Sequence, residues 1–125
     1  MSEAVDLALL RRAIRYIRKQ INWKPGKAQA HLDKRISRGH LGSKTTLAEY
    51  EAIITTVLFH PDAVVYVYRY GVTDYPTVVA PCGGRLWLVM VGPEGIMEMA
   101  FPPDDTGTYF SDPRYIFVGK LKELL

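Results

Sequence analysis

The stretch "AVVYVYRYGVTDYPTVVAPCGGRLWLVMV" (63–91) decides the fold class of this chain, because its apolar residues follow the pattern of β-strands. β-Branched and aromatic side chains pack well on a pleated surface, whereas glycine and proline interrupt strands. Turn residues at 71–76 and 82–84 divide the stretch into three expected strands: 63–70, 77–81 and 85–91. Connections this short favour antiparallel neighbours, so the stretch predicts part of an antiparallel sheet.

The sequence after this stretch extends the sheet. Turn residues at 92–95 precede a fourth apolar segment at 95–101, and a short last strand is expected at 114–119. The segment 101–113 is rich in proline, glycine and aspartate, which predicts a loop. A terminal turn is expected at 120–125. The complete sheet is therefore expected to have about four to five strands.

Before this stretch the apolar residues change to a helical period. Within 1–24 they recur at spacings of three and four while arginines and a lysine occupy the other faces, which predicts a basic amphipathic helix. Pro25-Gly26 is expected to end it. A second helix is expected over 27–38, because Ala28, Leu32 and Ile36 recur at a spacing of four. Gly39 is typical of the position just past a helix end.

A third helix is predicted from the pattern Thr46-Leu-Ala-Glu49. This is a capping box, in which the two polar side chains satisfy backbone N–H groups at a helix start. Pro61 is expected to end this helix. Helices first and strands afterwards predict one α+β domain over 1–125, with two to three N-terminal helices packed on a curved antiparallel sheet.

Charge is distributed unevenly along the chain. The net charge is +3, but residues 1–44 hold 11 of the 16 lysines and arginines against 3 of the 13 acids, a net charge of +8, and the remainder carries −5. This separation indicates either an anionic partner for the N-terminal third or pairing with the acidic part of the same chain. Both alternatives stay open at this point.

Several function classes lack their sequence signatures. Cys82 is the only cysteine, so neither an internal disulfide nor a cysteine-based zinc site can form. His31, His40 and His60 do not have the spacing of zinc ligands, and we expect no metal. No nucleotide-binding glycine pattern and no serine-hydrolase elbow occurs, so no cofactor is expected either.

The sequence also bears on the compartment. It contains no run of about 18 apolar residues and no signal-peptide pattern at its start. We therefore expect a cytoplasmic protein that does not interact with membranes. Export by a route that reads no N-terminal signal stays open.

The residues that remain suit acid–base chemistry on RNA without a metal. RNA carries its own nucleophile, the 2′-hydroxyl, so an enzyme needs to move two protons and stabilise a charged phosphorane. Histidine suits the proton transfers, and arginine suits the phosphate because it can bind two oxygens at once. The candidate catalytic residues are His31, Arg35, His40, Arg85, Tyr109, Ser111 and Tyr115. The candidates for steering the polyanion are Lys34, Arg38, Lys44, Arg15 and Arg18.

Three segments resemble the barnase/EndoU/colicin/RelE-like (BECR) superfamily of small ribonucleases, which includes phage-encoded domains and bacterial toxin modules. They are "GKAQAHLDKRISRGHLG" (26–42), "LAEYEAIITTVLFHPDAVVYV" (47–67) and "RLWLVMVGPEGIMEMAFPPDD" (85–105). In several of those families a helix carries a histidine with an arginine four places later, here His31 and Arg35. A glycine-rich segment follows. The resemblance covers roughly 26–118 and implies a helix-plus-sheet ribonuclease core.

The resemblance also implies further site residues. Some members have a second histidine directly after the arginine, where this chain has Ile36. His40 can take that place only if the loop after the helix folds back. A late strand or loop bears Thr or Ser and Tyr in those families. Here that motif is ambiguous among four residues: Thr108, Tyr109, Ser111 and Tyr115.

Three functions stay open on the sequence. The first is a toxin-like or phage-derived, metal-independent endoribonuclease that cuts RNA, such as tRNA, to a 2′,3′-cyclic phosphate; a cognate inhibitor or immunity protein is then expected as a partner. The second is a non-catalytic nucleic-acid-binding module whose exposed aromatics stack on bases: Trp87, Tyr66, Tyr68 and Tyr70. The third is a protein-interaction or structural domain of phage origin. The oligomeric state is not predicted.

Overall fold

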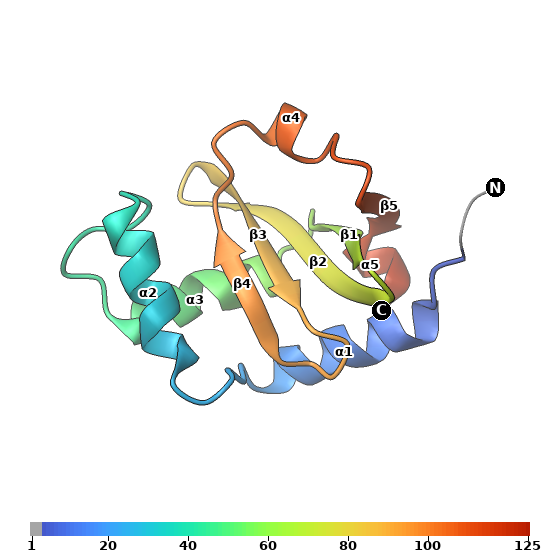
Figure 1. The fold of residues 1–125 in the computed structure, drawn as a ribbon, viewed down its shortest axis with the longest axis horizontal. Coiled ribbons are helices and arrows are strands. Elements are labelled where there is room, and N and C mark those ends of the chain that lie inside the picture. The colour runs from blue at the N-terminus through green and yellow to red at the C-terminus, as the bar shows by residue number, and fades with distance from the viewer. Residues whose placement is uncertain (1–3) are drawn as a thin grey trace.

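A computed structural model describes residues 4–125 and places three helices before a five-stranded sheet (Figure 1). The predicted α+β class is therefore confirmed. The elements in chain order are α1 (Leu7–Lys19), α2 (Lys27–Ser37), α3 (Leu47–Leu58), β1 (Val64–Tyr70), β2 (Thr73–Cys82), β3 (Arg85–Val91), β4 (Met97–Phe101), α4 (Thr106–Tyr109), β5 (Tyr115–Lys120) and α5 (Leu121–Leu124).

The strands form one antiparallel sheet in the order β4-β3-β2-β1-β5. Tight turns join β1 to β2 and β2 to β3, and Gly71 and Gly83 take the positive φ angles, +63° and +61°, that such turns require. The chain then crosses from β4 at one edge to β5 at the other, where β5 pairs with β1. The segment that makes this crossing, 102–114, lies over one end of the sheet (Figure 1).

Two predictions about loops were wrong. Residues 74–76 lie within β2 instead of a turn, because the two residues Gly71-Val72 already reverse the chain. Pro76 fits there because it pairs only with Val67 of β1; β3 begins to pair with β2 at Thr77, so no ladder bond from Pro76 is needed on that side. The predicted loop 101–113 also contains α4.

The end of the first helix was also predicted wrongly. The start of the predicted segment 1–24, residues 1–3, lies outside the described residues. The helix α1 ends at Lys19, well before Pro25-Gly26, and Gln20 is extended. Tertiary contacts account for this: the carbonyl of Asn22 accepts a hydrogen bond of 2.7 Å from the amide of Met97 at the start of β4. Local periodicity carries no information about such a contact.

The capping box of the third helix is confirmed. The Glu49 amide donates to Oγ1 of Thr46 over 3.1 Å, and Oε1 of Glu49 accepts from the Thr46 amide over 2.9 Å. This cap begins α3, which lies behind the sheet in the view of Figure 1.

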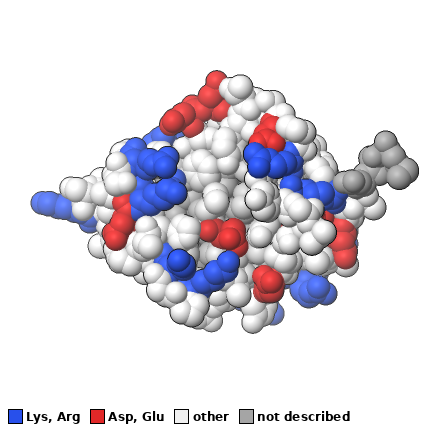
Figure 2. Space-filling model, viewed as in Figure 1, with Lys and Arg blue, Asp and Glu red and all other residues white. Residues whose placement is uncertain are grey.

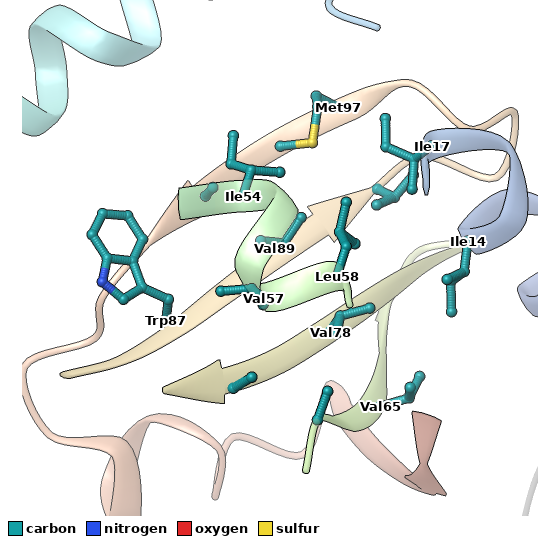
Figure 3. Packing of buried hydrophobic residues seen from close by; sticks show 14 of the residues in the cluster. Ile14, Ile17, Ile54, Val57, Leu58, Val65, Val78, Trp87, Val89 and Met97 are labelled. Atoms are coloured by element: carbon teal, nitrogen blue, oxygen red, sulfur yellow. The ribbon is translucent and has the colours of Figure 1, made fainter. Parts of the chain in front are cut away.

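The main core lies between the sheet and the helices α1 and α3. Figure 3 shows isoleucines of both helices pointing at alternate residues of the strands, such as Val65, Val78 and Val89. Tyr50 of α3 is fully buried there, and its hydroxyl donates a 2.6 Å hydrogen bond to the carbonyl of Ala100 on β4. This bond ties α3 to the edge of the sheet next to α2.

The opposite face of the sheet is aromatic. We call it the aromatic face and define it by six side chains: Tyr66, Tyr68, Tyr70, Tyr75, Tyr115 and Phe117. Tyr66, Tyr68 and Tyr70 share this face, as their alternation predicted, and they point away from α1 and α3. Trp87, expected to be exposed, is buried in the helix-side core, 6.4 Å from the ring of Tyr50.

Among residues 4–125, no helix is long and apolar enough to cross a membrane.

Candidate functional site

The helix α2 forms one wall of a cleft beside the sheet. Leu32 is buried in the main core and anchors α2. Its neighbours on the helix surface therefore lie at the edge of the contact between α2 and the core. Those residues are His31 and Arg35, which are four apart and project together as the sequence predicted. The opposite wall is the end of β4 and the segment that leads into α4.

The cleft has a volume of about 550 Å³. Figure 2 shows basic side chains beside α2 on the left of this face and acidic side chains above them, near α4. The residues lining the cleft are His31, Lys34, Arg35, Arg38, His40, Met99, Phe101, Pro102, Pro103, Asp104, Asp105, Thr108 and Tyr109. Seven of them were candidates from the sequence: His31, Lys34, Arg35, Arg38, His40, Thr108 and Tyr109.

Arg35 is the most unusual of these residues, because its side chain is charged yet only 7% exposed. Its Nη1 bonds to His40 over 3.1 Å, its guanidinium lies 5.2 Å from the centre of the Phe101 ring, and its Nε has no hydrogen-bond partner. In the described part of the chain, no carboxylate pairs with it. Burial lowers the pKa of this guanidinium. A buried charge without a counter-ion is costly, so the cleft is electrostatically suited to an anion.

His40 reaches Arg35 because the loop after α2 folds back. Gly39 has φ +73°, and the amide of His40 then bonds to the carbonyl of Arg35 over 2.9 Å. Arginine can only donate, so Nδ1 of His40 must be the acceptor, and the ring is neutral with its proton on Nε2. Burial lowers the pKa of His40, and the charges of Arg35 and Arg85 lower it further. The imidazole therefore presents an N–H donor.

His31 has a different environment. Burial lowers the pKa of its imidazole, followed by the positive charges of Arg35 and Lys34. Its ring lies 5.3 Å from the ring of Trp23, and within residues 4–125 no group forms a hydrogen bond with it. His31 is thus neutral near pH 7 and keeps a nitrogen lone pair that can accept a proton.

Tyr109 lies on the far side of the cleft, and Tyr115 lies behind it. Tyr115 on β5 is buried and donates a 2.9 Å hydrogen bond from its hydroxyl to that of Tyr109. Burial raises the pKa of Tyr115, and this hydrogen bond raises it further. Because Tyr109 accepts this bond, its own hydroxyl proton is free to be donated into the cleft. The carboxylate of Asp105 caps the short helix α4 that carries Tyr109.

Other candidates lie outside the cleft. Arg85 is exposed at the start of β3, and only its charge reaches His40. Ser111 donates its hydroxyl to the carbonyl of Thr108 over 2.6 Å. Arg18 lies 4.1 Å from the centre of the Phe59 ring. The remaining two, Lys44 and Arg15, are exposed away from the cleft lining.

Sequence reasoning missed several parts of the site. Trp23 against His31, and Phe101 under Arg35 and His40, are contacts between distant segments that no local pattern indicates. Asp105 could have been found, because an aspartate before Thr-Gly-Thr is a typical helix cap. Asp104 also lies in the cleft lining, and its negative charge partly opposes the lowering of the His40 pKa.

The described residues contain no group of three His, Cys, Asp or Glu side chains placed to hold a metal ion. Comparison with known protein families, with characterised proteins and with solved structures gives no match. The site is therefore interpreted from its own geometry.

Proposed function

We propose that this chain is a metal-independent endoribonuclease that cleaves RNA by attack of a 2′-hydroxyl on the adjacent phosphate. The observation that carries the proposal is the buried guanidinium of Arg35, without a counter-ion, in a cleft that also holds two neutral histidines. A phosphodiester supplies the missing anion, and RNA brings its own nucleophile. A toxin-like or phage-derived origin, with a cognate inhibitor, is part of the same proposal and rests on the resemblance to BECR ribonucleases.

In the proposed reaction His31 is the general base. Its neutral imidazole takes the proton of the 2′-hydroxyl, whose oxygen forms a bond to phosphorus. Negative charge then grows on the non-bridging phosphate oxygens. Arg35 stabilises that charge by charge-assisted hydrogen bonds, and Nε2–H of His40 donates to the same group.

Tyr109 is the proposed general acid. The bond from phosphorus to the 5′ oxygen breaks, and that oxygen takes the proton of the Tyr109 hydroxyl. The hydroxyl of Tyr115 stabilises the resulting phenolate through its existing hydrogen bond. Water then protonates Tyr109, while His31 returns its proton to water. The products are a 2′,3′-cyclic phosphate and a free 5′-hydroxyl.

The first test uses total tRNA and labelled RNA oligonucleotides in excess EDTA, with mass spectrometry of the ends. We expect cyclic phosphate ends from the wild type and at least about a hundredfold loss of rate in His31→Gln, since general bases contribute at least that much. His60→Gln is the matched control, because His60 does not line the cleft. Its Nδ1 accepts a hydrogen bond from the amide of Asp62. We expect that variant to cut normally.

Arg35→Met tests the residue that carries the proposal. A methionine fills similar space without a charge, so the cost of burying an unpaired cation disappears. We expect the cleavage rate to fall at least about a hundredfold while the midpoint of thermal unfolding stays the same or rises. A large drop in that midpoint means that the guanidinium holds the fold, and it removes the main support for the proposal.

The other two functions predict different outcomes. Tight RNA binding without cleavage identifies a non-catalytic nucleic-acid-binding module. Self-association that depends on salt, with no RNA binding, identifies a protein-interaction domain. Either result replaces the ribonuclease proposal.

A further inference from the structure

The aromatic face carries large rings that the fold leaves open to solvent. Tyr70 is 61% exposed and Phe117 is 58% exposed. Phe117 lies opposite Tyr66, and Tyr70 lies two positions beyond Tyr68 on the same face of β1, which Tyr66 also shares. In Figure 2 an area of mostly uncharged side chains, with one acidic group near its centre, lies between the basic group beside α2 and a second basic group on the right that adjoins an acidic side chain. Flat exposed rings between positive charges are the arrangement that proteins use to hold single-stranded nucleic acid.

These rings are connected to the cleft by continuous contacts. Phe101, in the cleft lining, lies 5.6 Å from Tyr109, measured between ring centres, and Tyr109 lies 5.3 Å from Tyr115. From Tyr115 the next ring is Tyr68 at 4.8 Å, and Tyr68 stacks on Tyr70 at 6.3 Å with an angle of 8° between the rings. The chain of rings therefore leads from the proposed phosphate site to the exposed end of β1.

A positive charge accompanies this path. The guanidinium of Arg114 lies 5.4 Å from the centre of the Tyr68 ring and is held by a 2.7 Å ion pair with Asp112. An arginine fixed over a tyrosine offers both a stacking surface and a donor for a phosphate oxygen. The open face therefore matches both parts of a nucleotide, its base and its phosphate.

We propose that the substrate is single-stranded RNA several nucleotides long, whose scissile phosphate lies in the cleft while flanking bases stack on the exposed rings of Tyr70 and Phe117. This inference rests on the proposed function and adds the substrate class. Bases paired in a duplex cannot present their faces to these rings, so an RNA helix does not fit. The stacking is tolerant of sequence, because every base has a π-face.

The test compares kcat/KM for a dinucleotide, an octanucleotide with the same scissile step, and a perfect hairpin that contains that step. We expect the octanucleotide to be cut much faster than the other two. Tyr70→Ala is expected to lower kcat/KM for the octanucleotide at least about fivefold and to leave the dinucleotide unchanged, because stacking on one base contributes that much. Phe117→Ala is expected to act in the same way.

Tyr16→Ala is the matched control. Tyr16 is 55% exposed but lies on α1, on a different surface from the aromatic face. We expect it to match the wild type on every substrate. Thermal unfolding of all three variants checks that each still folds.

The outcomes separate this inference from the function on which it rests. Equal rates on dinucleotide and octanucleotide, or full activity of Tyr70→Ala and Phe117→Ala, overturn the stacking surface and leave a ribonuclease. If no RNA is cut, fluorescence anisotropy with the octanucleotide decides: weaker binding by Tyr70→Ala supports the stacking surface without catalysis. No binding at all overturns both proposals.

Discussion

At the scale of single residues, the cleft makes two histidines chemically different. His40 has Nδ1 occupied by Arg35, whereas the ring of His31 packs on Trp23 and has no hydrogen-bond partner among the described residues. The sequence offered both as acid or base without distinguishing them. In the proposed reaction, these different neighbours suit His31 to accept the proton and His40 to donate a hydrogen bond.

The lowered pKa of His31 predicts the pH dependence of cleavage. In the proposed reaction His31 must be neutral to act as the general base, and its pKa lies below the ordinary value of 6.5. We therefore expect kcat/KM to rise with pH at values below 6.5 and to be flat near pH 7. Lys34→Gln removes one of the charges that lower this pKa, so the rise is expected to shift to higher pH. A rise centred above pH 7 in the wild type contradicts this assignment.

The same shift predicts how stability changes with pH. In the unfolded chain His31 binds its proton near pH 6.5, and in the folded chain only at lower pH. Stability is therefore lost as the pH falls from 6.5 towards the lower folded value, and thermal unfolding of the wild type and of His31→Gln measures it. The loss is expected to be smaller in the variant.

At the scale of elements, the turn after α2 decides whether the site forms. The left-handed conformation of Gly39 ends the helix and returns the chain so that His40 meets Arg35. The sequence predicted a helix end at this glycine, and the observed end at Ser37 agrees closely. The sequence did not predict that the loop folds back towards Arg35, because the path of a loop depends on the residues it packs against.

Gly39→Ala tests this turn. A Cβ at this position meets no atom within 4 Å, so the effect isolates the backbone conformation, which costs a residue other than glycine about 1–2 kcal/mol. We expect the free energy of unfolding to fall by that amount and cleavage to weaken as the contact between His40 and Arg35 loosens. Gly42→Ala is the control, since Gly42 has no positive φ and its Cβ makes an ordinary contact. Equal losses in both variants contradict the prediction.

At the scale of the whole molecule, the basic residues are not one continuous surface. Lys34 and Arg38 line the cleft, whereas Arg15 belongs to a group on the outer side of α1 that lines a separate hollow. The basic residues of the N-terminal third therefore form two separate groups, one at the cleft and one on the outer side of α1. We expect the group at the cleft to steer RNA in the proposed function.

Salt titration of RNA binding tests this division. Each phosphate contact releases counterions, so Lys34→Gln and Arg38→Gln are each expected to reduce the slope of log K against log salt by about 0.7 for a single strand. Arg15→Gln is expected to leave the slope unchanged, although the sequence offered Arg15 as a contact. An equal effect of all three variants means that α1 also binds the strand.

The order and type of the main elements follow from local sequence patterns alone. The helical period before 60, the capping box at Thr46 and the strand pattern of 85–91 are properties of neighbouring residues, and the structure has each of them. The sequence also predicts that His31 and Arg35 share a helix face, because a spacing of four fixes that by geometry alone.

Which face of the sheet the helices cover depends on tertiary packing. Alternation in a strand puts Tyr66 and Val65 on opposite sides but does not say which side is buried. The helices α1 and α3 pack on the side of Val65 and Trp87, so the tyrosines lie on the other side, where Tyr70 is exposed. The burial of Arg35 without a carboxylate partner likewise depends on Phe101 and Tyr50, which come from distant segments of the chain. Packing depends on contacts across the chain, whereas periodicity depends only on near neighbours.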